Sequence, residues 1–151
     1  MCYRAREATL FKNIHVRPNE EGTRMALYDL EADIMDVVWS NSWTTFSVRD
    51  VLEVLLEGRA IAYTTVMTTV SRLFDKGLLE REMDGRRYMY SPVVGRDEFQ
   101  ARIAIEVMTS LPDAGREVAM SMLVDEMSRD DDGALVQLEN LLAEHRENAD
   151  N

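Results

Sequence analysis

The sequence has little of what disulfide frameworks and membrane spans require. Its 151 residues include three prolines and a single cysteine, Cys2. One terminal thiol cannot build a disulfide framework within the chain, which favours a reducing, cytoplasmic environment. The longest apolar run, Val51 to Leu56, is interrupted by Glu53, and a membrane helix needs about 20 apolar residues. The sequence therefore predicts a cytoplasmic protein without membrane insertion.

Catalytic and metal-binding patterns are also missing. The two histidines, His15 and His145, stand near opposite ends of the chain, so they lack the spacing of paired metal ligands. There is no Gly-rich phosphate loop, no nucleophile elbow and no carboxylate pair that periodicity places in a cleft. These absences predict that the protein is not an enzyme and that it binds neither a cofactor nor a metal.

Basic residues are few and unevenly placed. The chain has 17 Lys and Arg against 28 Asp and Glu, a net charge of −11, which argues against unspecific coating of nucleic acid. Residues 26–58 carry −6 and residues 95–151 carry −9, whereas residues 1–25 and 59–94 each carry +2. The acidic total therefore leaves room for a local positive face in residues 59–94.

The beginning of the chain is predicted to be an arm followed by three helices. Residues 1–25 show no sustained period and are expected to form a flexible arm or a translated extension. Apolar residues then recur at helical spacing in three segments, at about 29–40, from Ser47 to just before Gly58, and at about 61–76.

The ends of these segments carry capping residues. Asp29 and Ser47 are predicted N-caps, and Gly77 is expected in the left-handed position after the third helix. In the first helix, Glu31, Asp33 and Asp36 are expected to face out.

A hairpin is predicted after the third helix, because the apolar period changes from 3.6 to 2. Leu79–Met83 and Arg87–Tyr90 flank Asp84-Gly85, a type I′ turn signal that would pair Glu82 with Arg87. Thr44–Phe46 is expected to add a third strand. This order of elements predicts a mainly α fold, a winged helix-turn-helix domain of three helices and a small antiparallel sheet over residues 26–94.

Residues 95–151 are predicted to form a helical dimerisation region. Breaks at Leu111-Pro112 and between Asp130 and Gly133 divide them into three short amphipathic helices. Such helices cannot bury their apolar faces alone, so a second copy of the chain is predicted to cover them. The expected contact residues are Phe99, Ile103, Val107, Met120, Leu123, Val124, Met127, Leu135, Leu138 and Leu142.

The third predicted helix carries the candidate DNA-reading face. Four threonines, Thr64, Thr65, Thr68 and Thr69, are poor helix formers because β-branching restricts χ1. Short hydroxyl side chains let a helix approach the floor of a major groove. We expect base contacts from Thr64, Thr65, Thr68 and Arg72, and backbone contacts from Arg59, Tyr63, Ser71, Arg86 and Arg87. The alternatives are a solvated threonine face and a hairpin whose arginines are neutralised by its own glutamates.

Four stretches resemble the penicillinase-repressor family of BlaI/MecI-type winged-helix regulators. They are Leu30–Trp39, Ala62–Val66, Arg72–Leu78 and Gly85–Pro92, the last ending in Tyr-x-Tyr-Ser-Pro. The resemblance rests on specific motifs over about residues 27–95 and only on helix pattern over about residues 96–147.

The resemblance implies a homodimer on a palindromic operator in double-stranded DNA. The third helix would lie in the major groove, the wing on the backbone, and the C-terminal helices would form the dimer contact. Repressors of this family are released when a membrane sensor metalloprotease signals and the repressor is cleaved. The corresponding stretch is Met108–Ala114, where no residue pattern identifies a cleavage site. A copper-responsive branch uses C-terminal cysteine pairs, which this sequence lacks.

Two other functions fit the same fold. A winged helix can serve as a protein-interaction module without specific DNA binding, and the acidic net charge of the chain favours this alternative. A repressor of this architecture can also sense a small ligand.

Overall fold

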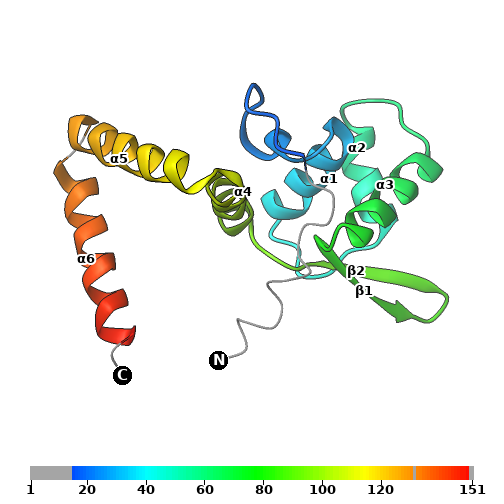
Figure 1. Cartoon of the computed structure of the whole chain (residues 1–151). Coiled ribbons are helices and arrows are strands. Elements are labelled where there is room, and N and C mark those ends of the chain that lie inside the picture. Colours follow the sequence, from blue (N-terminus) through cyan, green and yellow to red (C-terminus); the bar gives the residue numbers. More distant parts are fainter. Residues whose placement is uncertain (1–14, 131, 150–151) are drawn as a thin grey trace. The chain divides into compact units, whose positions relative to one another are not determined.

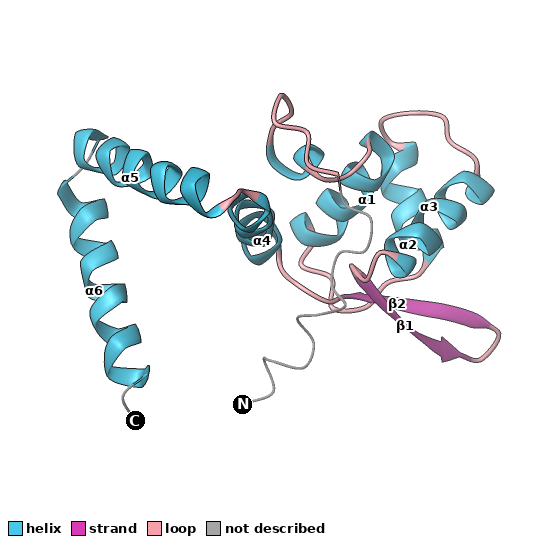
Figure 2. Cartoon of the chain, viewed as in Figure 1, coloured by secondary structure: helices cyan, strands magenta, loops and turns pink. Residues whose placement is uncertain are grey.

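The elements of the fold follow the predicted order. The computed structural model describes residues 15–130 and 132–149, and the chain divides into two units, residues 1–104 and 105–151. The elements are a 3₁₀ helix η1 (Gly22–Met25), helices α1 (Asp29–Ser40), α2 (Val48–Leu56) and α3 (Tyr63–Asp75), strands β1 (Leu79–Asp84) and β2 (Arg87–Pro92), and helices α4 (Arg96–Ser110), α5 (Asp113–Asp130) and α6 (Asp132–Ala149) (Figures 1 and 2).

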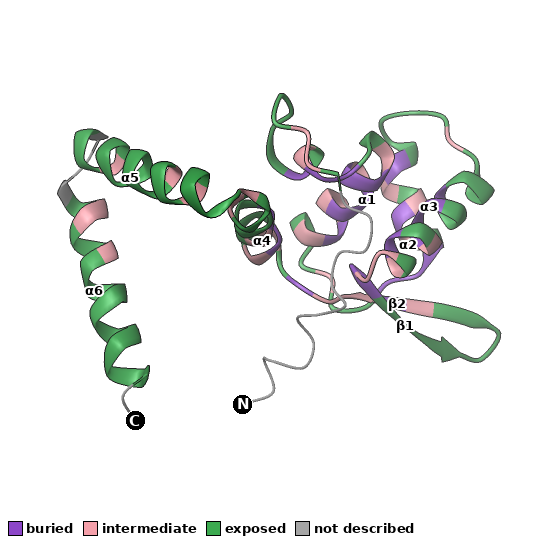
Figure 3. Ribbon diagram, in the orientation of Figure 1, coloured by how far each residue is buried: buried purple, intermediate pink, exposed green. Residues whose placement is uncertain are grey.

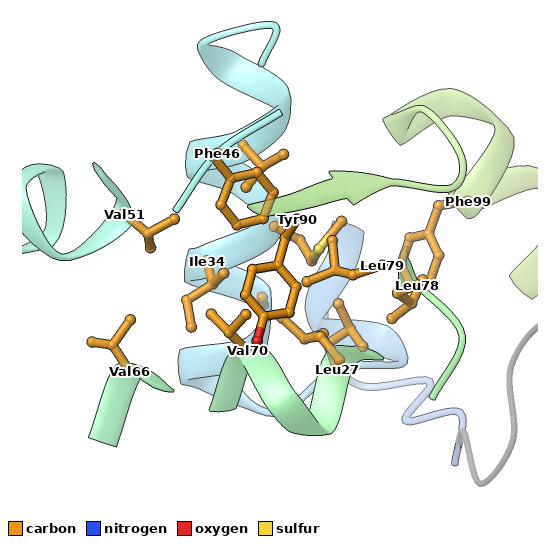
Figure 4. Close-up of a cluster of buried hydrophobic side chains, with 14 of the residues drawn as sticks. Leu27, Ile34, Phe46, Val51, Val66, Val70, Leu78, Leu79, Tyr90 and Phe99 are labelled. Carbon is orange, nitrogen blue, oxygen red and sulfur yellow. The ribbon is translucent and has the colours of Figure 1, made fainter. Parts of the chain in front are cut away.

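A shared apolar core joins the elements of the first unit. Helices α1, α2 and α3 contribute fully buried side chains, among them Ile34, Val51 and Val70. Leu79 and Tyr90 of the hairpin close the same cluster (Figure 4). Three helices packed on an antiparallel hairpin confirm the predicted winged helix-turn-helix.

Local capping sets the ends of α2 and α3. The Ser47 hydroxyl accepts a hydrogen bond from the Asp50 amide at 3.3 Å, and the Asp50 carboxylate accepts one from the Ser47 amide at 2.7 Å. This reciprocal capping box confirms the predicted cap. Gly77 has φ of 81°, which confirms the left-handed residue expected after α3.

The start of α1 differs from the prediction. Asp29 is the first helical residue, and the N-cap is Tyr28, whose amide donates to the Glu31 carboxylate at 3.2 Å. The expectation that Glu31 faces out is wrong. Glu31 is only 4% exposed, and its carboxylate lies 2.7 Å from the Lys76 ammonium. A single carboxylate therefore caps α1 and binds the end of α3.

The hairpin forms, but with another turn and register. Asp84 pairs with Arg87 and Glu82 with Met89, so the predicted Glu82–Arg87 pair is wrong. The two loop residues are Gly85 and Arg86. Gly85 has a φ of 64°, whereas Arg86 has a negative φ, because Ser42 alone among the described non-glycine residues has a positive one. That pattern fits a type II′ turn and excludes type I′. The opposite charges of Asp84 and Arg87 favour their pairing across the strands next to the turn.

The predicted third strand is reduced to one residue. Phe46 forms an isolated antiparallel bridge to Tyr90, with amide-to-carbonyl distances of 2.8 and 2.7 Å. The two rings stack with centroids 6.0 Å apart. This bridge attaches the base of the wing to the segment between α1 and α2.

The described part of the predicted arm packs on α1. The Thr23 hydroxyl donates to the Asp36 carboxylate at 3.2 Å, and the Arg24 guanidinium donates to Asp33 at 2.7 Å. The hydrogen bond from Arg24 to Asp33 raises the pKa of that guanidinium above its ordinary value. Residues 15–25 are therefore structured, and residues 1–14 lie outside the described residues.

The first half of α4 belongs to the winged-helix core. Phe99 is fully buried and Ile103 is 6% exposed, and the Phe99 ring lies 5.4 Å from the ring of Trp39. The Trp39 indole also donates to the Val94 carbonyl at 2.9 Å. The structure thus places Phe99 and Ile103 in the core of the winged-helix unit and outside the predicted dimer contact, because both side chains are already buried there. The first unit accordingly extends past residue 94 to residue 104.

The second unit consists of the end of α4 with α5 and α6. The break predicted at Leu111-Pro112 is present between α4 and α5, and the one predicted between Asp130 and Gly133 falls at residue 131, outside the described residues. The Arg116 guanidinium donates to the carbonyls of Met108 and Leu111 at 3.1 and 3.0 Å. The described side chains of α5 and α6 are exposed or half buried (Figure 3). In residues 15–130 and 132–149, no helix has the length and apolarity that crossing a bilayer requires.

Phe99→Ala tests whether α4 is part of the winged-helix core. Removing a fully buried ring should lower the free energy of unfolding by about 3–5 kcal/mol, measured by urea denaturation with circular dichroism. Ile105→Ala, in the same helix at a residue 61% exposed, is the matched control and should change it by about 0.5 kcal/mol or less. Equal losses in the two variants would contradict the assignment.

Candidate nucleic-acid interface

The exposed face of α3 brings the predicted base-reading residues together. Thr64, Thr68 and Arg72 follow one another at four-residue spacing and are exposed, with Thr65 exposed beside them. The Thr68 hydroxyl donates to the Thr64 carbonyl at 2.8 Å, and its oxygen keeps the capacity to accept from a ligand.

The fourth threonine has a structural position. Thr69 is 6% exposed, and its hydroxyl donates to the Thr65 carbonyl at 2.9 Å. The backbone bond satisfies this buried hydroxyl, so Thr69 contributes to the core side of α3. Of the four threonines of α3, three therefore remain for the predicted base-contacting face.

A groove of about 790 Å³ runs between α2, α3 and the wing. Tyr63, Met67 and Ser71 line it from α3, again at four-residue spacing. Arg81, Tyr88 and Tyr90 line it from the hairpin, and the remaining lining residues are Ser47, Val48, Arg49, Leu52, Arg86 and Arg87. The groove thus adjoins the threonine face and has four arginines along its walls.

Two cations of the positive segment are held by carboxylates of α1. The Arg59 guanidinium lies 2.8 Å from the Asp33 carboxylate, and the Lys76 ammonium is the partner of Glu31. Asp33 also binds Arg24 at 2.7 Å. Arg59, a predicted backbone contact, is therefore engaged within the protein, and a phosphate would have to compete with Asp33 for it.

The wing arginines are much less constrained. Arg87 lies 3.4 Å from Asp84 across the hairpin, with both side chains about two-thirds exposed. An exposed pair of this kind contributes about 0–1 kcal/mol. Arg86 forms no ion pair or hydrogen bond with any described residue. Both remain accessible to an anion.

Arg49 and Arg81 were missed by the sequence reasoning. Like those of Arg72 and Arg86, their side chains form no ion pair or hydrogen bond with the described part of the chain, and both residues line the groove. Arg49 lies in the first turn of α2, where a cation opposes the helix dipole, so helix stability does not account for it. Arg81 alternates along β1 with Glu80 and Glu82, which assigns it to the face shared with Tyr90.

The arrangement suits a nucleic acid, which presents both phosphates and base edges to a protein. Guanidinium groups bind phosphate through paired N–H donors, and four of them surround the groove. The hydroxyl stripe of α3 beside it offers short polar groups for base edges. Groups suited to the phosphate backbone and groups suited to base edges thus lie on adjacent surfaces of one unit.

Comparison with known proteins gives concordant matches. A family model described as penicillinase repressor matches residues 27–144. The chain is 39% identical over 110 residues to the transcriptional regulator BlaI of Mycobacterium tuberculosis, covering 72% of this chain and 79% of that protein. It is 27% identical over 71 residues to the penicillinase repressor of Bacillus licheniformis, covering 47% and 54% of the two chains.

Two solved structures are similar to part of the chain. The solution structure of the DNA-binding domain of the repressor BlaI matches with 25% identity and a TM-score of 0.42, covering 48% of this chain and 85% of that one. The Bacillus licheniformis BlaI monomeric form in complex with the blaP half-operator matches with 26% identity and a TM-score of 0.40, at the same coverage.

Gly85→Ala tests the turn that shapes the wing. A Cβ at this position would meet nothing within 4 Å, but φ is +64°, so the substitution should cost about 1–2 kcal/mol of stability through backbone strain alone. Gly58→Ala is the control, since its Cβ would make only an ordinary contact and its φ is not in the left-handed region. The shift in urea midpoint is the measurement, and an unchanged midpoint for Gly85→Ala would rule out the strained turn.

Proposed function

The chain belongs to the penicillinase repressor family, and on this premise we propose that it is a sequence-specific DNA-binding transcriptional repressor acting as a homodimer on a palindromic operator. The observation that carries the proposal is a groove whose arginines have weak ion pairs or none among the described residues, next to the exposed threonine face of α3. A protein acting on chromosomal DNA in this way is expected in the cytoplasm.

In this proposal α3 reads base edges and the surrounding residues bind the backbone. Thr64, Thr65, Thr68 and Arg72 form the reading set. The predicted backbone set of Tyr63, Ser71, Arg86 and Arg87 gains Arg49, while Arg59 contributes less because Asp33 already binds it. Contacts of the second kind fix the register of the helix on the duplex and carry no sequence information.

Exposed apolar side chains in the second unit support the homodimer. Val107, Met120, Leu123, Val124 and Leu142 of the predicted contact set are between 37 and 55% exposed, while Met127, Leu135 and Leu138 are half buried. Large apolar side chains left exposed in such number favour a protein–protein contact. A two-fold dimer would present two copies of α3 to the two halves of a palindrome.

Release of the repressor by proteolysis is the proposed regulatory step. The stretch Met108–Ala114 spans the break between α4 and α5, where Pro112 and Ala114 are exposed. Exposed connections are the usual sites of proteolytic cleavage. Cutting here would separate the dimer helices from the winged-helix unit, in response to a membrane sensor metalloprotease.

Binding to its own promoter tests the proposal directly. Anisotropy of labelled duplexes should show tight binding to promoter DNA that weakens steeply with salt. Replacing Arg86 and Arg87 by Ala should weaken binding to promoter and random duplex alike. Thr68→Ala or Arg72→Ala should instead reduce the preference for the promoter, by about 1–3 kcal/mol for each interaction with a base that the substitution removes.

Equal affinity for promoter and random duplex at every salt concentration would reject sequence-specific repression. That result would favour the alternative of a winged-helix module that binds another protein.

Sedimentation equilibrium tests the homodimer. The protein should sediment as a dimer, and Leu123→Asp should shift it toward monomer, because a carboxylate cannot be buried unpaired in an apolar contact. Ser121→Asp, which introduces the same charge at an exposed polar position of α5, should leave the dimer intact. A monomeric wild type at concentrations that saturate operator DNA would contradict the proposal.

A further inference from the structure

We propose that Arg81 is a pre-oriented phosphate-binding residue, held between two aromatic rings so that it receives one phosphate of the DNA strand in the groove between α3 and the wing. The inference rests on the proposed function, which supplies the DNA, and it adds a residue that neither the sequence motifs nor the threonine face indicated.

The rings hold the guanidinium from two elements of the fold. The Arg81 guanidinium carbon lies 4.2 Å from the centroid of Phe74, in the last turn of α3, and 4.4 Å from the centroid of Tyr88 in β2. Phe74 is half buried against the core. The guanidinium therefore rests on one ring from the recognition helix and one from the wing, and it ties these two elements together.

Two cation–π contacts restrict a side chain that is otherwise mobile. Each adds a modest attraction at an exposed site, and together they are comparable to the rotamer entropy that a free arginine loses when it is immobilised. Because the two effects are of similar size, the ring-bound conformer of this side chain is substantially populated before any ligand arrives. Pre-orientation of this kind strengthens binding by reducing the ordering cost.

The hydrogen-bonding capacity of Arg81 remains unused within the described residues. Its contacts there are with ring faces, and it forms no hydrogen bond or ion pair with another described residue. Contacts with the two ring faces use none of the guanidinium N–H groups, which remain able to bind an acceptor. A planar fork of free donors matches the geometry of a phosphate.

The surroundings of Arg81 favour an anion. Arg49, Arg86 and Arg87 line the same groove, so the side chains facing it repel one another until a negative group enters. Glu80 and Glu82 alternate with Arg81 along β1 and lie on the opposite face of the hairpin. The groove consequently concentrates positive charge on its inner walls despite the acidic strand residues nearby.

Salt titrations of duplex binding by full-length Arg81 variants test the inference. The logarithm of the affinity falls linearly with the logarithm of the salt concentration, and removing one phosphate contact should make this slope shallower by about one. We therefore expect Arg81→Met to reduce that slope by about one and to weaken binding about tenfold, equally on promoter and random duplex. Arg129→Met is the matched control, because it makes the same charge change at an exposed residue of α5 and should bind as the wild type does.

Two further variants separate charge from orientation. Arg81→Lys keeps the charge but cannot stack as a plane or donate a fork, so the salt slope should persist while affinity falls several-fold. Tyr88→Leu removes one ring and keeps the arginine, and should give the same pattern. Wild-type affinity in both variants would overturn the ring-held orientation.

The outcomes distinguish this inference from the proposed function. A wild type that prefers its promoter, with an Arg81→Met variant of unchanged slope and affinity, would overturn the role of Arg81 and leave repression standing. A wild type without promoter preference would reject specific repression, yet the slope on random duplex would still decide whether Arg81 binds a phosphate.

Discussion

Three carboxylates on α1 hold the neighbouring elements of the winged-helix unit in place. Glu31 binds Lys76 at the end of α3, and Asp33 binds Arg59 in the segment before α3. Asp36 lies 3.4 Å from Arg96 at the start of α4. The opposite face of the same helix is buried in the core. One helix therefore forms ion pairs at both ends of α3 and at the start of α4, the helix that leads to the second unit.

These pairs change the meaning of the acidic composition. The charge of −6 on residues 26–58 includes carboxylates that are bound to cations inside the unit, so it overstates the negative field that a duplex would meet. The cations bound in this way lie outside the groove, whereas the arginines lining it have weak partners or none among the described residues. The fold thus sorts its bases into those that hold the protein together and those available to a ligand.

Periodicity was sufficient to predict the helices, the hairpin and the winged-helix order, because each depends on local spacing of apolar residues. It could not show what covers an apolar face, so Phe99 and Ile103 were assigned to a second copy rather than to the core of their own winged-helix unit. The turn register depended on which residue takes positive φ, and an Asp-Gly pair allows two answers. The predicted base contacts Thr64, Thr68 and Arg72 do lie on one stripe. Arg49 and Arg81 were missed because their significance lies in facing the groove without an ion pair among the described residues, which only the three-dimensional arrangement reveals.

The contact between Trp39 and Phe99 also makes the two units optically distinguishable. The chain has two tryptophans, Trp39 and Trp43, and both lie in residues 1–104. Indole emission therefore reports the environment of the winged-helix unit alone, with Trp39 next to the Val94 carbonyl and the Phe99 ring, and Trp43 next to the Phe46 ring. Helical ellipticity reports both units together. Any difference between the two signals during unfolding belongs to the helices that follow residue 104.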